Sequence, residues 1–97
     1  MVTHVVLLRW KPTTSPEEAG ATLAAVRGLA DAVPGIVELR CGENFSRERA
    51  AGFEAALVVV LRDRAALAGY ADHPRHLPVK ARIAALCAQV LALDFEG

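Results

Sequence analysis

Aromatic residues are scarce in this 97-residue chain, where one tryptophan, one tyrosine and three phenylalanines make up 5% of the sequence. So few rings argue against a platform on which nucleic-acid bases stack. A charge excess is also missing, because 11 basic residues balance 11 acidic ones. A neutral chain lacks the basic surface that binds nucleic acid or an anionic membrane. We therefore expect neither nucleic acid nor a membrane as a partner.

Cysteine is rare too, with Cys41 and Cys87 as the two thiols of the chain. They lie far apart in the sequence and form no C-x-x-C motif, so a disulfide framework is not expected. The first residues lack the charged region and cleavage site of a signal peptide. No apolar run approaches the ~20 residues that span a bilayer. These absences predict a reduced, cytoplasmic protein.

Hydrophobic residues, in contrast, are abundant at 54%, and the mean hydropathy is +0.30. The length predicts a single domain over residues 1–97. A domain of this size buries only roughly 60–68% of the surface that its unfolded chain exposes. The chain therefore carries more apolar material than one small core hides, which predicts a partner surface.

The order of the predicted elements is βαββαβ. Apolar and β-branched runs predict strands over residues 3–11, 36–41, 53–62 and 90–95. Ser15 and Glu18 form a capping box that begins a helix, with Pro16 at its first position, and the helix extends to Val33 before Pro34-Gly35 ends it. Helical segments are also predicted from Asp63 to Tyr70 and from Val79 to Cys87, and residues 42–51 are predicted to form a polar loop. This order predicts an α+β fold with helices on one face of an antiparallel sheet.

Three of the strands are apolar at every position rather than at alternate ones. They contain Val5 to Leu8, Leu57 to Leu61 and Val90 to Leu93. Continuous apolar runs are typical of strands buried on both faces. Because the helices reach one face only, we expect a homodimer in which a second copy covers the other face.

Several short segments, taken in order, resemble one known family. These segments are His4-Val5-Val6-Leu7-Leu8, Val33-Pro34-Gly35-Ile36, Gly42 with Ser46, Ala51-Gly52-Phe53, residues 67–76 (LAGYADHPRH) and Asp94-Phe95. Together they resemble the dimeric α+β barrel proteins, also called stress-responsive A/B barrel domains. The resemblance implies a ferredoxin-like fold and a sheet-to-sheet homodimer.

One branch of that family, the polyketide cyclases, closes rings by an aldol-type reaction without a cofactor. The tyrosine and the second histidine of its Y-x-x-H-P-x-H stretch form the acid/base pair, and they match Tyr70 and His76 here. His4 matches a histidine of the first strand, whereas Ala55 stands where the third strand of the branch has one. The bulky aromatic residues of the cyclase pocket are absent from the first helix. The resemblance thus implies catalysis by His76 and Tyr70 and leaves the particular cyclase substrate open.

The residue types themselves fit proton abstraction beside a carbonyl group. That reaction needs a base that titrates near neutral pH and a donor for the developing oxyanion, and imidazole and phenol supply both. The alternative is that His76 braces the turn around Pro74 and Pro78 while Tyr70 packs in the core. We expect a small apolar cavity between sheet and helices. Its expected substrate-binding residues are His4, Val6, Leu8, Leu23, Val26, Leu57, Val59, Val79 and Val90.

We predict no metal and no cofactor. His73 and His76 have H-x-x-H spacing, but Pro74 lies between them and no third ligand is evident. The leading hypothesis is cofactor-independent acid/base catalysis, by an aldol-type cyclase or related lyase, on a small, polyketide-like carbonyl compound. The alternatives are a non-catalytic dimeric stress-response or binding module and a cofactor-free monooxygenase. A cavity that holds both Tyr70 and His76 favours the enzyme, and a packed core with His76 bound to backbone favours the module.

Overall fold

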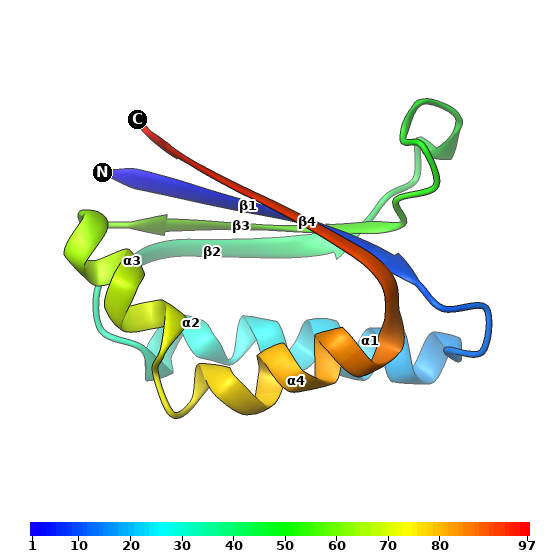
Figure 1. The fold of residues 1–97 in the computed structure, drawn as a ribbon, viewed down its shortest axis with the longest axis horizontal. Coiled ribbons are helices and arrows are strands. Elements are labelled where there is room, and N and C mark those ends of the chain that lie inside the picture. The colour runs from blue at the N-terminus through cyan, green and yellow to red at the C-terminus, as the bar shows by residue number, and fades with distance from the viewer.

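A four-stranded antiparallel sheet lies on one layer of helices (Figure 1). The computed structural model describes residues 1–97. The strands are β1 (Val2–Trp10), β2 (Ile36–Glu43), β3 (Ala55–Leu61) and β4 (Cys87–Glu96), and the helices are α1 (Pro16–Arg27), α2 (Leu29–Ala32), α3 (Arg64–Ala71) and α4 (His76–Leu86). The strand order β2-β3-β1-β4 confirms the predicted ferredoxin-like α+β fold. No helix combines the length and hydrophobicity that a membrane span requires.

The capping box begins α1 as predicted. The Glu18 amide nitrogen donates to the Ser15 Oγ at 3.1 Å, and the Ser15 amide nitrogen donates to the Glu18 Oε1 at 3.0 Å. The helix does not continue to Val33, however. It stops before Gly28, and the short α2 follows. Glycine has a low helix propensity because its backbone has more freedom to lose, which explains a break at this position.

The second helical region also differs from the prediction. The helix α4 begins at His76 rather than at Val79, so Pro78 lies inside its first turn. Proline is tolerated there because the first amide groups of a helix have no partner within it. The strand β2 continues to Glu43, β4 begins at Cys87, and the polar loop contains a short 3-10 helix at Arg47–Arg49.

The core lies between the sheet and the helices. The fully buried side chains include Leu8, Val59, Leu61 and Val26. Along β3, burial alternates strictly, with Ala55 and Leu57 buried and their neighbours only half-buried. The helices therefore cover one face of the sheet, which we call the inner face.

The opposite, outer face has no helix over it (Figure 1). Its central positions, identified by strand register, are Thr3, Val5, Leu7, Ala56, Val58, Val60, Leu91, Leu93 and Phe95. Within the single chain, Leu91, Leu93 and Phe95 are 47%, 57% and 50% exposed. The strands are thus apolar on both faces, as predicted, and one apolar face is left open.

Gly35, between α2 and β2, lies in close contact with Ala66 of α3. Its φ is +91°, and an added Cβ would lie 2.7 Å from the Cβ of Ala66. Left-handed backbone costs about 1–2 kcal/mol for other residues, and the clash adds to that. Gly35→Ala should therefore lower the free energy of unfolding by about 2 kcal/mol or more. The measurement is urea denaturation followed by circular dichroism.

Gly20→Ala in α1 is the matched control, because a Cβ there meets nothing within 4 Å. Alanine at a helical glycine should stabilise the protein by roughly 0.5–1 kcal/mol. Equal effects of the two substitutions, measured at one protein concentration, would contradict the close contact at Gly35.

Candidate functional site

A cavity of about 500 Å³ opens between the inner face and the helices. Its wall draws residues from β1, β3 and β4 and from all four helices, and 12 of its 17 lining residues are hydrophobic. The volume lies within the range of small-molecule sites, which are mostly apolar with a few placed polar groups. The other five lining residues, which are polar or charged, are His4, Arg64, His76, Lys80 and Asp94, and Tyr70 adds a phenol hydroxyl.

Most of the residues expected around a cavity do line it. They are His4, Val6, Val26, Leu57, Tyr70, His76, Val79 and Val90. Leu8, Leu23 and Val59 do not line it and belong only to the packed core. Strand and helix periodicity identifies the face of a side chain. It does not tell which part of that face is packed and which part is open.

His76 is fixed by the turn that joins α3 to α4. Its Nδ1 lies 2.9 Å from the carbonyl oxygen of Tyr70 and 3.3 Å from that of Ala71. A carbonyl oxygen accepts hydrogen bonds and never donates them, so Nδ1 must carry the proton. In the neutral ring, Nε2 then holds the free lone pair. The bond to backbone that a bracing histidine would make therefore also orients this ring as a base.

Burial lowers the pKa of His76 and raises the pKa of Tyr70. Desolvation lowers the pKa of His76 below its ordinary 6.5, and the charge of Lys80 lowers it further, against the opposing effect of the two carbonyl groups. The imidazole is therefore neutral at pH 7. Burial raises the pKa of Tyr70 to about 12, so the phenol keeps its proton and remains a donor.

The three rings of the cavity lie close together. Tyr70 and His76 are stacked, with ring centroids 4.1 Å apart and an interplanar angle of 22°. His4 meets Tyr70 edge-on, with centroids 5.9 Å apart and an angle of 65°. The helices α3 and α4 thus bring the predicted acid and base together, and β1 adds a second histidine beside them.

Asp94 is a site residue that the sequence analysis missed. It lies on β4 directly opposite His4 on β1, and its carboxylate accepts a hydrogen bond from the Nδ1–H of His4. His4 is therefore satisfied by a partner and also lines the cavity. An aspartate on the last strand is visible in the sequence, but its meeting with His4 depends on the register of two strands that are far apart in the chain.

The remaining charged groups lie on the helical side of the cavity. Arg64 of α3 donates to Glu96 at 2.6 Å, which balances its charge, whereas Lys80 is exposed on α4. His73 lies in the turn, where its Nδ1 accepts a hydrogen bond from the Arg75 amide nitrogen at 3.0 Å. Nowhere do three or more His, Cys, Asp or Glu side chains gather as a metal-ligand group.

The tautomer and titration of His76 give a direct test by nitrogen-15 NMR. We expect the neutral ring to carry its proton on Nδ1 and to titrate below pH 6.5, because burial lowers its pKa. The folded state then binds fewer protons than the unfolded state at acid pH, so stability falls as the pH drops below about 6.5. The His76→Gln variant lacks the signal of this ring and thereby assigns it. Its stability should fall less than that of the wild type as the pH drops. A ring protonated on Nε2 would contradict the geometry.

Comparison with known proteins identifies the family. The profile of the stress responsive A/B barrel domain (Dabb) matches residues 2–97. A stress-response A/B barrel domain-containing protein of Arabidopsis thaliana is 34% identical over 62 residues, which are 64% of this chain and 24% of that protein. The matched segment thus represents about a quarter of the length of this relative.

Two solved structures share the fold. A dimeric ferredoxin-like protein of unknown function from Thermobifida fusca is 27% identical with a TM-score of 0.88, and the match covers 99% of this chain and 90% of that one. The hydroxynitrile lyase of Passiflora edulis is 22% identical with a TM-score of 0.89, covering 97% and 90% of the two chains. At that identity, the second likeness shows the fold alone. Because the family profile extends over nearly the whole sequence, this chain belongs to the stress responsive A/B barrel domain family.

Proposed function

We propose that the protein is a homodimer that binds a small carbonyl compound in the cavity of each protomer and catalyses cofactor-independent acid/base chemistry on it. One observation carries this proposal. The Nδ1 of His76 is held by two backbone carbonyl groups, which leaves Nε2 as a free base in a largely apolar cavity that also holds the Tyr70 phenol. A histidine that only braced the turn would need no such cavity.

The reaction that fits these groups begins with removal of a proton from a carbon next to a carbonyl group. The Nε2 of His76 takes that proton, and the Tyr70 hydroxyl donates a hydrogen bond to the oxygen where negative charge develops. The resulting enolate carbon forms a bond to a second carbonyl carbon of the same molecule, whose oxygen then receives the proton from His76. This sequence is an aldol-type ring closure, in which no oxidant or reductant takes part.

The wall of the cavity supports one chemical class of substrate. A volume of about 500 Å³ with 12 hydrophobic lining residues favours a small, mostly apolar molecule over a highly charged one. A polyketide-like chain has carbonyl groups on alternate carbons, so the hydrogens between them are acidic and a more distant carbonyl is available for ring closure. The resemblance of the Tyr70–His76 stretch to the polyketide cyclases supports the same class. The reverse type of step, cleavage of a carbon–carbon bond, needs the same acid and base.

The homodimer is supported by the open apolar face. A standard interface buries about 1,200–2,000 Å² in total, and the outer face offers apolar side chains from β1, β3 and β4. The related protein from Thermobifida fusca is described as dimeric. A second copy with the same outer face would remove both apolar surfaces from water.

Turnover by variants tests the acid/base proposal. The assay presents a panel of β-polyketones and cyanohydrins to the wild type and follows products by NMR. His76→Gln should lower the rate on any converted compound about 10²–10⁴-fold, because it removes the general base. Tyr70→Phe should lower it while the fold persists, since the ring remains. Because the neutral imidazole is the working form, the wild-type rate should rise with pH, with its midpoint below 6.5.

His73→Ala is the matched control, because His73 lies in the same turn with its Nδ1 bound to backbone. Its rate should stay near that of the wild type. If His76→Gln retains the full rate on a compound that the wild type converts, His76 is not the base. If the cavity binds ligands and converts none of the panel, a binding module replaces the enzyme as the best interpretation.

Val58→Asp tests the homodimer. Val58 lies on the outer face, where a dimer would bury an unpaired carboxylate at high cost. We expect the variant to be a folded monomer, or to unfold, at concentrations where the wild type is a dimer. Light scattering gives the mass, and circular dichroism gives the fold. Leu77→Asp, at an exposed apolar position on α4, should leave the dimer intact. A wild type that is monomeric at micromolar concentration would contradict the proposal.

A further inference from the structure

The connection between β2 and β3 projects from the sheet. Residues 44–54, which we call the arm, rise above the outer face, on the side away from the helices (Figure 1). The arm contains the 3-10 helix at Arg47–Arg49. Its position matters because the outer face is the apolar surface that no helix covers.

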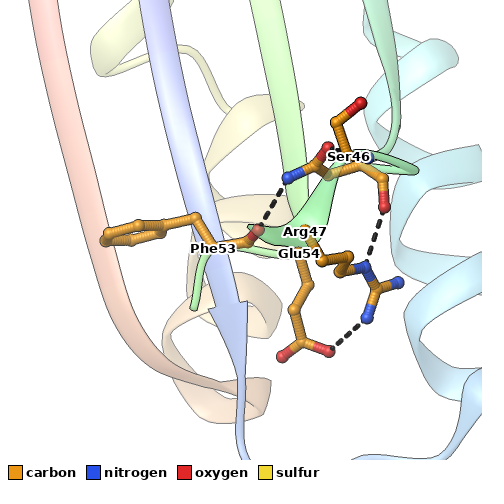
Figure 2. A network of polar contacts seen from close by, with 5 residues as sticks. Ser46, Arg47, Phe53 and Glu54 are labelled. Atoms are coloured by element: carbon orange, nitrogen blue, oxygen red, sulfur yellow. Dashed lines mark hydrogen bonds and ion pairs between the residues drawn. The ribbon is translucent and has the colours of Figure 1, made fainter. Parts of the chain in front are cut away.

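Hydrogen bonds hold the arm in one shape (Figure 2). The Asn44 amide nitrogen donates to the Glu54 carbonyl oxygen at 2.8 Å, and the Asn44 side chain donates to the Phe53 carbonyl oxygen at 3.2 Å. Arg47 donates from Nε to the Asn44 carbonyl oxygen at 2.8 Å and from Nη1 to the Glu54 carboxylate at 3.3 Å. An arm that is already ordered loses little conformational freedom when a partner binds it.

One apolar side chain of the arm is left almost wholly uncovered by the rest of the chain. Phe45 is 97% exposed. Between the arm and the sheet lies a second hollow, of about 550 Å³, which we call the arm pocket. Its apolar wall is formed by Leu7, Phe45, Ala50, Ala51, Phe53, Ala55 and Ala56. An ordered arm that holds an exposed phenylalanine over an apolar hollow is shaped for another apolar surface.

The edges of the sheet indicate how a second copy would sit. The edge strands are β2 and β4, and the antiparallel pairings make them run in opposite directions. A two-fold axis between two outer faces, parallel to the strands, places β4 of each copy beside β2 of the other. Each edge strand then faces an antiparallel edge strand of the other copy, and curvature of the two sheets toward each other would bring these edges together. The two arms lie on opposite sides of the axis and do not collide.

Rotation about such an axis does not change the position of a residue along the strand direction. Leu91 of β4 is paired with Leu7, and Leu7 is paired with Ala56. Leu7 and Ala56 both line the arm pocket. A Leu91 side chain of the second copy therefore lies at the height of this pocket, on the side where the arm stands. It faces outward and is 47% exposed in the single chain.

We propose that the arm of each protomer closes over β4 of the other, so that Leu91 of the second copy enters the arm pocket and contacts Phe45. This inference rests on the proposed homodimer and assigns to the arm a role in holding it. The arm acts on the outer face and the catalytic groups lie on the inner face, so the proposal does not depend on the reaction.

A double-mutant cycle on dimer dissociation tests the contact. Phe45→Ala and Leu91→Ala should each raise the dissociation constant at least about tenfold, as truncation of a buried interface anchor does. If the side chains touch, the double variant should be affected less than the product of the two effects. Phe95→Ala provides a matched partner, because Phe95 pairs with Thr3 near the other end of the sheet. Phe95→Ala and Phe45→Ala should therefore act independently, so that the dissociation constant of their double variant rises by the product of the two single effects.

Sedimentation over a dilution series gives the dissociation constants, and circular dichroism shows that each variant is folded. Leu77→Ala, an exposed apolar side chain on the helical layer, should leave the constant unchanged. If the wild type is a monomer, the homodimer itself is wrong. If the wild type is a dimer and Phe45→Ala has no effect, or multiplies fully with Leu91→Ala, the homodimer stands and the arm contact is overturned.

Discussion

The rest of the structure depends on a mismatch between three strands that are apolar on both faces, β1, β3 and β4, and a single layer of helices. The helices cover the inner face, and no helix lies over the outer one (Figure 1). Burial drives the helices onto one side, because apolar area removed from water is the main favourable contribution to folding. The inner face thereby becomes core and cavity, and the outer face is left uncovered within the single chain.

The candidate site depends on one short piece of backbone. The segment from Tyr70 to His76 carries the phenol, the imidazole and the carbonyl groups that fix the imidazole proton on Nδ1. Because α4 begins at His76, the ring is held at the start of a helix rather than on a mobile loop. A rigid element positions reacting groups more closely than a loop does. The turn between α3 and α4 is thus more than a connection, because it orients the imidazole that we propose as the base.

Local sequence patterns predict the structural features that depend on residues close together in the chain. The capping box at Ser15, the strand over the apolar run Leu57 to Leu61 and the spacing of Tyr70 and His76 all belong to this kind, and the structure has each of them. Asp94 differs, because its partner His4 is at the other end of the chain and is reached only through strand register.

The errors of prediction have the same origin. Leu8, Leu23 and Val59 lie on the predicted faces of their strand or helix, but they belong to the core rather than to the cavity wall. Periodicity carries no information on where packing leaves a gap. The predicted start of α4 is too late because Pro78 resembles a helix break. In fact a proline in the first turn interrupts no hydrogen bond. Gly28, in turn, lies inside an otherwise periodic helical pattern, although it is where α1 ends.

The strand β4 contributes to both faces within a few residues. Val90, Ala92 and Asp94 line the cavity, and Leu91, Leu93 and Phe95 alternate with them on the outer face. As an edge strand it is bonded only to β1. A change in the course of this strand therefore alters the cavity wall and the outer face together, and with them the proposed ligand binding and the proposed self-association. A substitution at Val26 on α1 or at Leu67 on α3 alters the cavity wall without altering the outer face. A shift of the β4 backbone, in contrast, alters both surfaces.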